Sequence, residues 1–226
     1  MVILVYSCDK NKDLWTPFNH CIEKYWKDHP KVIYKTEKLK NPYYETITAN
    51  YPMNEWTKGI REVLDQIDDK IILFMADDIF IRRPVDIDRL KYAIRFLEWS
   101  KHGANFNLEK SFDLRDKEIK PGISQRCSKL WKVSIMCGLW KKEALKKILT
   151  ENTTPWDIEE KGNDYGYDYY INSGDYIIDW GYSFLNYAGI KRGKWCKEAK
   201  YFFDNEGVNI DYGKRGFVDD NNSTLQ

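Results

Sequence analysis

Apolar and polar residues follow two different rhythms along the first hundred residues. Short runs rich in β-branched and aromatic residues are typical of buried strands, and they occur at 2–6, at 32–34 and from Ile71 onward. Between and after these runs, apolar residues recur at helical spacing, in segments that begin after Asp13, after Asn54 and at 86. We expect Asp13 and Asn54 to cap the first two of these helices. The alternating order predicts an α/β fold with a mainly parallel central sheet and helices on both faces.

The pattern becomes less regular after residue 100. We expect short strands at 104–108 and 130–136 and a helix at 141–149. An irregular aromatic and acidic stretch should follow at 151–179, and a last helix at 197–205. We therefore predict one domain over residues 1–218, with halves at 1–100 and 101–218. A flexible tail is expected at 219–226, where polar residues predominate.

Composition excludes some classes of protein. Lys and Arg number 36 against 35 Asp and Glu, so the net charge of +1 offers no general attraction to nucleic acid. Aromatic residues make up 15% of the chain, which suits a groove for sugars or an aromatic-rich core. The 5 cysteines are widely spaced and suggest reduced thiols. Without a signal peptide or a long apolar stretch, we expect a cytoplasmic protein, at most peripheral to a membrane.

The run from Ile71 ends abruptly in Asp77 and Asp78. Unpaired charges are rarely buried, so the two carboxylates should emerge at the carboxyl end of the strand. In open α/β sheets this edge is where ligands bind. Adjacent carboxylates suit Mg²⁺ or Mn²⁺, which prefer oxygen ligands and often also hold phosphates. The alternative is a turn with two solvated aspartates.

Two further segments carry candidate chemistry. The loop at 7–13 contains no glycine, which excludes a phosphate-binding Gly-rich loop. Its polar side chains could bind a nucleobase or ribose, or form an ordinary connector. At 153–160, Thr154 and Pro155 predict a helix start, and acidic residues follow Trp156. This is either an acidic first turn or a carboxylate that deprotonates a sugar hydroxyl stacked on the indole.

Together these segments resemble the GT-A-fold nucleotide-sugar glycosyltransferases, especially small bacterial and viral members linked to surface polysaccharides. The resemblance covers most of the chain, to about Arg215. It rests on Val2–Tyr6 leading into Ser7-Cys8-Asp9, Trp56, the acidic pair ending at Asp78, Leu139-Trp140-Lys141, Pro155-Trp156-Asp157-Ile158-Glu159 and Gly193-Lys194-Trp195. The chain departs from the acid-x-acid metal motif of the family, because position 76 is Ala.

The resemblance implies a Rossmann-like nucleotide-binding half and a more variable acceptor-binding half. It implies Mn²⁺ or Mg²⁺ at Asp78, with Asp77 in support. The donor-binding residues it suggests are Ser7, Asp9, Trp56, Arg61, Asp77 and Lys194. Glu159 is the expected catalytic base, with Asp157 as the alternative, and Trp140 and Trp156 are expected to bind the acceptor.

The activity implied is transfer of a sugar from a nucleoside diphosphate sugar, most simply a UDP-sugar, to the hydroxyl of a saccharide or other acceptor in polysaccharide biosynthesis. Inversion at the anomeric carbon is expected, with retention left open. Two alternatives remain. One is a nucleotidylyltransferase of related fold, although its chemistry generally uses a Gly-rich first loop. The other is a non-catalytic carbohydrate-binding protein.

Overall fold

The structure is a computed structural model that describes residues 1–110, 113, 115–127, 132–149, 153–161, 165–181 and 189–218. The tail expected at 219–226 lies outside these residues. In the described part of the chain, no helix has the length and apolar character needed to cross a membrane.

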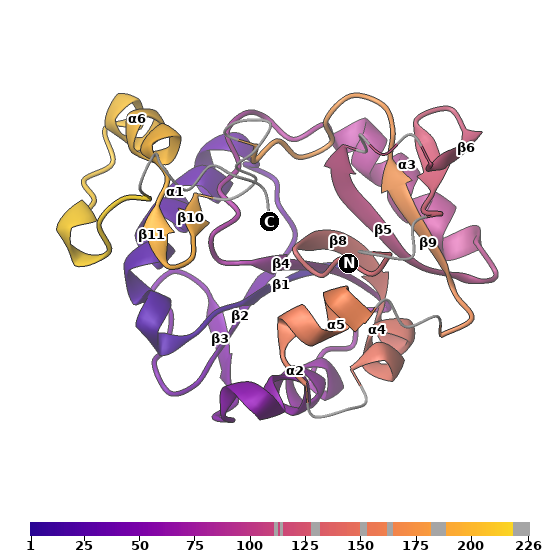
Figure 1. The fold of residues 1–226 in the computed structure, drawn as a ribbon, viewed down its shortest axis with the longest axis horizontal. Coiled ribbons are helices and arrows are strands. Elements are labelled where there is room, and N and C mark those ends of the chain that lie inside the picture. Colours follow the sequence, from indigo (N-terminus) through magenta and orange to yellow (C-terminus); the bar gives the residue numbers. More distant parts are fainter. Residues whose placement is uncertain are drawn as a thin grey trace.

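A nine-stranded sheet runs through the described part of the molecule, in the order β3-β2-β1-β4-β8-β5-β9-β7-β6 (Figure 1). Its strands are β1 (Val2–Tyr6), β2 (Val32–Thr36), β3 (Glu45–Thr48), β4 (Ile71–Ala76), β5 (Gly103–Lys110), β6 (Lys117–Lys120), β7 (Ile123–Gln125), β8 (Cys137–Lys141) and β9 (Asp168–Asn172). Strands β3, β2, β1 and β4 are parallel, as are β5 and β9, whereas β8 runs antiparallel to both β4 and β5.

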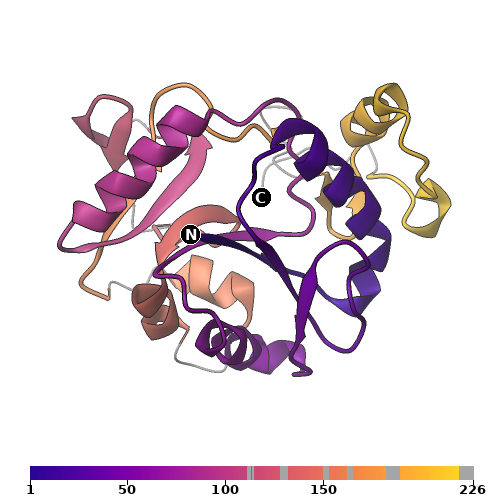
Figure 2. The ribbon, with the colours of Figure 1, turned by 180° about the vertical axis from the view of Figure 1, so that it is seen from behind.

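Helices cover both faces of this sheet (Figures 1 and 2). They are α1 (Trp15–Tyr25), α2 (Trp56–Asp65), α3 (Ile87–Trp99), α4 (Lys142–Ile148), α5 (Pro155–Lys161) and α6 (Lys197–Glu206). Helices α1, α3 and α6 share one buried core, which includes Phe18, Leu97 and Phe203. Helices α2, α4 and α5 pack into a second core. The predicted α/β fold class, a Rossmann-like sheet with helices on both faces, is confirmed, and β8 is inserted antiparallel between β4 and β5.

The remaining elements are short. The described residues include three 3₁₀ helices. Of these, η1 (Asp9–Leu14) precedes α1, η2 (Met53–Glu55) precedes α2, and η3 (Tyr212–Lys214) follows α6. A small antiparallel hairpin joins β10 (Ile190–Lys191) to β11 (Lys194–Trp195). Figure 1 shows this hairpin beside α1 and α6, so a late segment of the chain lies next to an early one.

The register of the parallel strands sets the position of the site. Tyr6 at the end of β1 is level with Lys35 in β2 and with Ala76 at the end of β4. The residues that follow these strands therefore meet at one edge of the sheet. This arrangement brings Ser7 next to Asp77, although 70 positions separate them in the sequence.

Two of the expected helix caps are wrong. Each helix is entered through a 3₁₀ turn, so α1 starts at Trp15 and α2 at Trp56, without a side-chain cap on either. Asp13 instead forms an ion pair with Arg215. Asp86 does cap the next helix, because its carboxylate accepts a hydrogen bond of 3.0 Å from the backbone N–H of Arg89.

The strand expected at 130–136 is also wrong where the structure describes it. Residues 132–136 form a loop, and the strand, β8, follows at Cys137–Lys141. Val133 and Ile135 alternate as in a strand because both point into the second core, not because they pair with a neighbour. The stretch at 151–179 is less irregular than expected, since it contains α5 and β9.

Candidate active site

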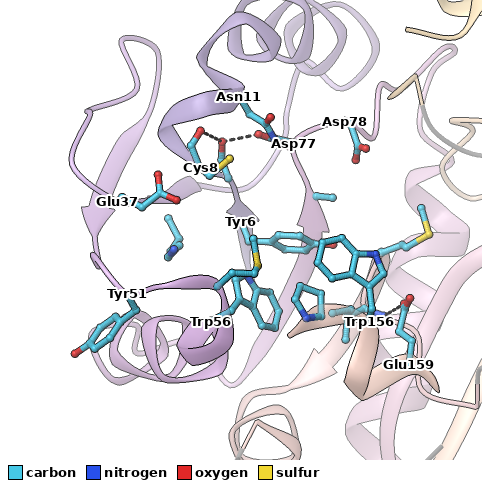
Figure 3. A pocket seen from close by; sticks show the side chains of 17 residues that line it. Tyr6, Cys8, Asn11, Glu37, Tyr51, Trp56, Asp77, Asp78, Trp156 and Glu159 are labelled. Carbon is cyan, nitrogen blue, oxygen red and sulfur yellow. Dashed lines mark hydrogen bonds between the residues drawn. The ribbon is translucent and has the colours of Figure 1, made fainter. Parts of the chain in front are cut away.

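A pocket of about 340 Å³ lies at the edge of the sheet where β1, β2 and β4 end. Figure 3 shows it from close by. Tyr6 and Trp56 form part of its lining, with their ring centroids 5.5 Å apart in an edge-on arrangement. Figure 3 places Glu37 and Tyr51 at one end of the pocket, and Asp78 and Glu159 at the other. The pocket is therefore elongated, with different chemistry at its two ends.

Asp77 is held by a small buried network. Its carboxylate accepts hydrogen bonds from the hydroxyl of Ser7 and from Nδ2 of Asn11, the latter at 3.2 Å. The indole N–H of Trp15 donates in turn to Oγ of Ser7 at 2.9 Å. Burial, reinforced by the neighbouring charge of Asp78, raises the pKa of Asp77 to about 8. Asp77 thus fixes the loop after β1 against the end of β4.

Asp78 is different, because its carboxylate has no hydrogen bond or ion pair with another described side chain. The residue is half-buried and lines the pocket. Burial raises the pKa of its carboxyl to about 6. A carboxylate held in a pocket without a partner favours binding of a cation. Among the described residues, no group of three or more acidic, His or Cys side chains is placed to hold a metal ion.

Helix α5 contributes Glu159 to the end of the pocket that also contains Asp78. Thr154 and Asp157 form a reciprocal cap, since Oγ1 of Thr154 accepts from the N–H of Asp157 at 3.2 Å and donates to its carboxylate at 2.6 Å. Asp157 therefore holds the helix start and does not line the pocket. Glu159 does line it, with only 9% of its surface exposed. Trp156 is 58% exposed and lies between Asp78 and Glu159 in Figure 3.

The carboxylate of Glu159 is fixed from behind. Its Oε1 accepts a hydrogen bond of 2.8 Å from the backbone N–H of Ile135, in the loop before β8. Burial raises the pKa of Glu159. The same loop is tied to the acidic pair, because the N–H of Ala76 donates to the carbonyl of Met136 at 3.0 Å. One short segment thus connects Glu159 with the end of β4, where the acidic pair follows.

Trp140 does not bind an acceptor in this structure. Its side chain is fully buried in β8, where it packs edge-on against Tyr169 in the second core. The expectation that its ring stacks on a sugar is therefore wrong. The sequence signal was an aromatic residue near the acidic helix start, and burial of that residue depends on strand pairing that the local pattern does not show.

Three of the expected donor-binding residues also lie outside the pocket. The carboxylate of Asp9 accepts hydrogen bonds from the backbone of Lys38 and Leu39, so it orders the loop after β2. Arg61 in α2 donates to a backbone carbonyl of α4 at 3.4 Å. Lys194 is exposed in the β10–β11 hairpin. Ser7 and Trp56 do line the pocket, as does Asp77.

The structure adds two residues that the sequence analysis overlooked. Lys35 and Glu37, from β2 and the loop after it, both line the pocket, and the charge of Glu37 acts on Lys35. Figure 3 places Glu37 at the end away from Asp78. Lys35 interrupts the apolar run of β2, and this interruption was the available signal.

Arg215 was overlooked as well. It donates to Oδ1 of Asn11 at 2.9 Å, across 204 positions of sequence. Its charge counteracts the rise in the pKa of both Asp77 and Asp78. A local sequence pattern cannot predict a contact between residues that are 204 positions apart.

Comparisons with known proteins find a partly similar backbone in several solved structures. No family profile and no curated protein matches the sequence. Among solved structures, residues 1–349 of TarS from S. aureus align with a TM-score of 0.49 and 13% identity, over 77% of this chain and 58% of that one. The galactosyltransferase LgtC, solved with donor and acceptor sugar analogues, aligns with a TM-score of 0.41 and 10% identity, over 65% and 60%.

Two further solved structures are a bifunctional protein and a synthetase solved with CTP. The bifunctional IspDF from Campylobacter jejuni aligns with a TM-score of 0.47 and 12% identity, over 77% of this chain. CMP:2-keto-3-deoxy-manno-octonic acid synthetase, solved with CTP, aligns with a TM-score of 0.49 and 10% identity, over 75% of this chain and 88% of that one. The chain spans 50% of IspDF and 58% of the TarS fragment. These similarities concern the backbone fold, and function is argued below from the site.

Proposed function

We propose that this protein is a glycosyltransferase that moves a sugar from a nucleoside diphosphate sugar, a UDP-sugar in the simplest case, to an acceptor hydroxyl. One observation carries the proposal. A single pocket places the unpartnered carboxylate of Asp78 near a second, buried carboxylate, that of Glu159, with the exposed ring of Trp156 between them. This combination suits a charged leaving group at one side and a stacked sugar hydroxyl at the other.

Asp78 would hold a Mn²⁺ or Mg²⁺ ion, with Asp77 in support. The donor set fits, because carboxylate oxygens are the ligands that these cations prefer. An ion bound there would neutralise the negative charge that develops on the departing diphosphate. With two protein carboxylates, the ion would bind together with the phosphates of the donor, as Mg²⁺ sites often do.

Glu159 is the proposed general base. A buried carboxylate whose pKa is raised toward neutrality accepts a proton more effectively than a solvated one. The carboxylate is oriented by hydrogen bonds from the backbone N–H of Ile135 and from the side chain of Ser134. Trp156 would stack on the acceptor sugar and present its hydroxyl to that carboxylate. The role falls to Glu159 and not to Asp157, because the latter is occupied in the helix cap.

The test is product analysis with a panel of UDP-, GDP- and dTDP-sugars in the presence of Mn²⁺. We expect free nucleoside diphosphate to be released from one donor. The variant Asp78→Asn should lose this release at saturating Mn²⁺, whereas Asp77→Asn should lose less. Asp28→Asn serves as the matched control, because Asp28 is exposed and does not line the pocket.

Three results would contradict the proposal. Equal turnover by Asp78→Asn and the unmodified protein would remove Asp78 from the reaction. Release of pyrophosphate from a nucleoside triphosphate and a sugar phosphate would identify a nucleotidylyltransferase. Saccharide binding without any turnover of nucleotide sugars would identify a carbohydrate-binding protein.

A further inference from the structure

Lys35 is a lysine buried without a partner. Only 3% of its surface is exposed, and lysines are almost never fully buried unless they are paired. Its ammonium makes no hydrogen bond or ion pair with any described residue. Burial lowers its pKa, and the charges of Glu37, Cys8 and Asp9 offset this only in part. Burial therefore disfavours the charged form of Lys35, and none of the described residues offers its ammonium a hydrogen-bond acceptor.

The packing around Lys35 leaves room for its side chain. A methyl group added at Gly59 in α2 would lie 3.5 Å from Cε of Lys35 and 3.1 Å from the ring of Tyr51. The lysine stem thus passes over the one residue of α2 that has no side chain at this point. Lys35 lines the pocket together with Tyr51 and Trp56. Its ammonium belongs to the pocket and is not a part of the core.

A hydrogen-bond acceptor on a bound ligand would supply the partner that the ammonium of Lys35 lacks among the described residues. Glu37, two residues further on, lines the same end of the pocket, and its Oε2 is anchored by the backbone N–H of Asp9. This end thus offers a donor-only ammonium at depth and an acceptor-only carboxylate nearer the surface. If the diphosphate lies at Asp78, as the proposed function requires, the nucleoside extends toward this end.

We propose that Lys35 determines nucleobase specificity by donating to an exocyclic carbonyl oxygen of the base, with Glu37 accepting from the adjacent ring N–H. Uracil, thymine and guanine carry this keto arrangement. Cytosine and adenine instead carry an amino group, which is itself a donor, beside a ring nitrogen that lacks a proton. In these two bases the amino group would face the ammonium of Lys35, donor against donor, and the unprotonated ring nitrogen would face the carboxylate of Glu37, acceptor against acceptor. This inference rests on the proposed function and specifies its donor.

The experiment measures the binding of UDP, CDP, GDP and ADP in the presence of Mn²⁺ by calorimetry, for the unmodified protein, Lys35→Met and Lys40→Met. Methionine keeps the volume of the lysine stem without its charge. Lys40 is exposed, so its substitution controls for loss of a positive charge. We expect UDP or GDP to bind at least about ten-fold more tightly than its amino counterpart, the range of a charge-assisted hydrogen bond.

In Lys35→Met this preference should disappear, with the affinity for the keto nucleotide falling and that for the amino nucleotide unchanged. The melting temperature of the unliganded variant should rise, because an unpaired buried charge is replaced by an apolar group. A purely structural lysine would show neither effect.

Each other result overturns a defined statement. If Lys35→Met retains the same ratio of UDP to CDP and of GDP to ADP affinities, Lys35 does not read the base and the inference is wrong. If CDP or ADP binds most tightly to the unmodified protein, the keto assignment is wrong. If none of the four nucleotides binds with Mn²⁺, the proposed function itself fails.

Discussion

At the scale of the residue, the contacts of their carboxylates distinguish Glu159 from Asp157. Glu159 lines the pocket, whereas Asp157 is bonded to Thr154 in the helix cap. Glu159→Gln should reduce sugar transfer by about 10² to 10⁴-fold, the usual contribution of a positioned general base. Donor binding should stay near that of the unmodified protein, because Glu159 lies at the end of the pocket away from Glu37 and Tyr51. Transfer is measured with the best donor of the panel, and binding of the donor by calorimetry.

Asp157→Asn should leave transfer largely intact and cost about 1 kcal/mol of stability, as the loss of a helix cap does. Glu160→Gln is the matched control, because Glu160 is exposed on the same helix. Normal transfer by Glu159→Gln together with loss of transfer in Asp157→Asn would exchange their roles. Normal transfer by both would reduce this segment to a structural helix start.

The sequence was a good guide to which residues are chemically unusual, and a poor guide to their neighbours. Asp77, Asp78 and Glu159 stand out as acids beside apolar runs, and all three line the pocket. Trp140 stands out equally and is buried in the core. Whether an aromatic ring faces a pocket or a core depends on the strands on either side, and that information is not local.

At the scale of the element, Glu206 ties α6 to α1. Its carboxylate accepts hydrogen bonds from His20, Lys24 and Tyr25. Burial opposes its ionisation, but these partners outweigh it and lower the pKa of Glu206 to about 2. A carboxyl whose pKa is lower in the folded state stabilises the fold above its unfolded pKa, and this contribution is lost as pH falls.

Thermal unfolding at several pH values should therefore separate Glu206→Gln from the unmodified protein. We expect a constant gap in melting temperature above pH about 5, narrowing between about 4 and 2, since the unfolded pKa is about 4.3. A gap that is independent of pH down to about 2 would show that the variant loses packing and not charge.

Arg215 makes a second tie between elements, through bidentate contacts with Asp13 at 2.6 and 2.8 Å. Arg215 is 8% exposed in this ion pair. Arg215→Met should lower the free energy of unfolding by about 1–3 kcal/mol, because Asp13 loses its bidentate partner and keeps only the ammonium of Lys214. Urea denaturation measures this loss. Arg192→Met, at an exposed position of the β10–β11 hairpin, should change stability little; an equal loss in both variants would contradict the argument.

The elements themselves were predictable in proportion to their regularity. The strands β1 and β4 agree with the sequence pattern to within a few residues because each is a continuous buried apolar run. The helices α3 and α6 agree because each buries one face at helical spacing. The short strands β3, β6 and β7 were missed. No residue of β3 is buried and all of β6 is exposed, so these two strands exist because a neighbouring strand offers hydrogen bonds.

At the scale of the whole molecule, ligand binding should be visible as stabilisation. A ligand present at about 100 times its dissociation constant adds about 2.7 kcal/mol to the free energy of unfolding. For a chain of this size that corresponds to a rise in melting temperature of about 5–10 °C. UDP with Mn²⁺ should give such a shift, and Asp78→Asn should abolish its metal-dependent part. An identical shift in the variant would place the nucleotide away from Asp78.

The fold class followed from the order of strands and helices in the first hundred residues, whereas the topology beyond them did not. The strand β8 lies between β4 and β5 and runs antiparallel to both, beside the acidic pair. An antiparallel insertion is a fact about pairing partners distant in sequence, and periodicity within one segment contains no information about it.

The contact between Arg215 and Asn11 spans 204 positions, and Asn11 in turn holds Asp77. A ribosome adding about 5–20 residues per second needs about 10–40 s to make the chain between the two contact residues. The residues of β1, β2 and β4 are all made before Arg215, whose guanidinium counteracts the charge of the acidic pair. The loop after β1 is therefore among the first parts of the site to be translated, and its contact with Arg215 is among the last to become possible.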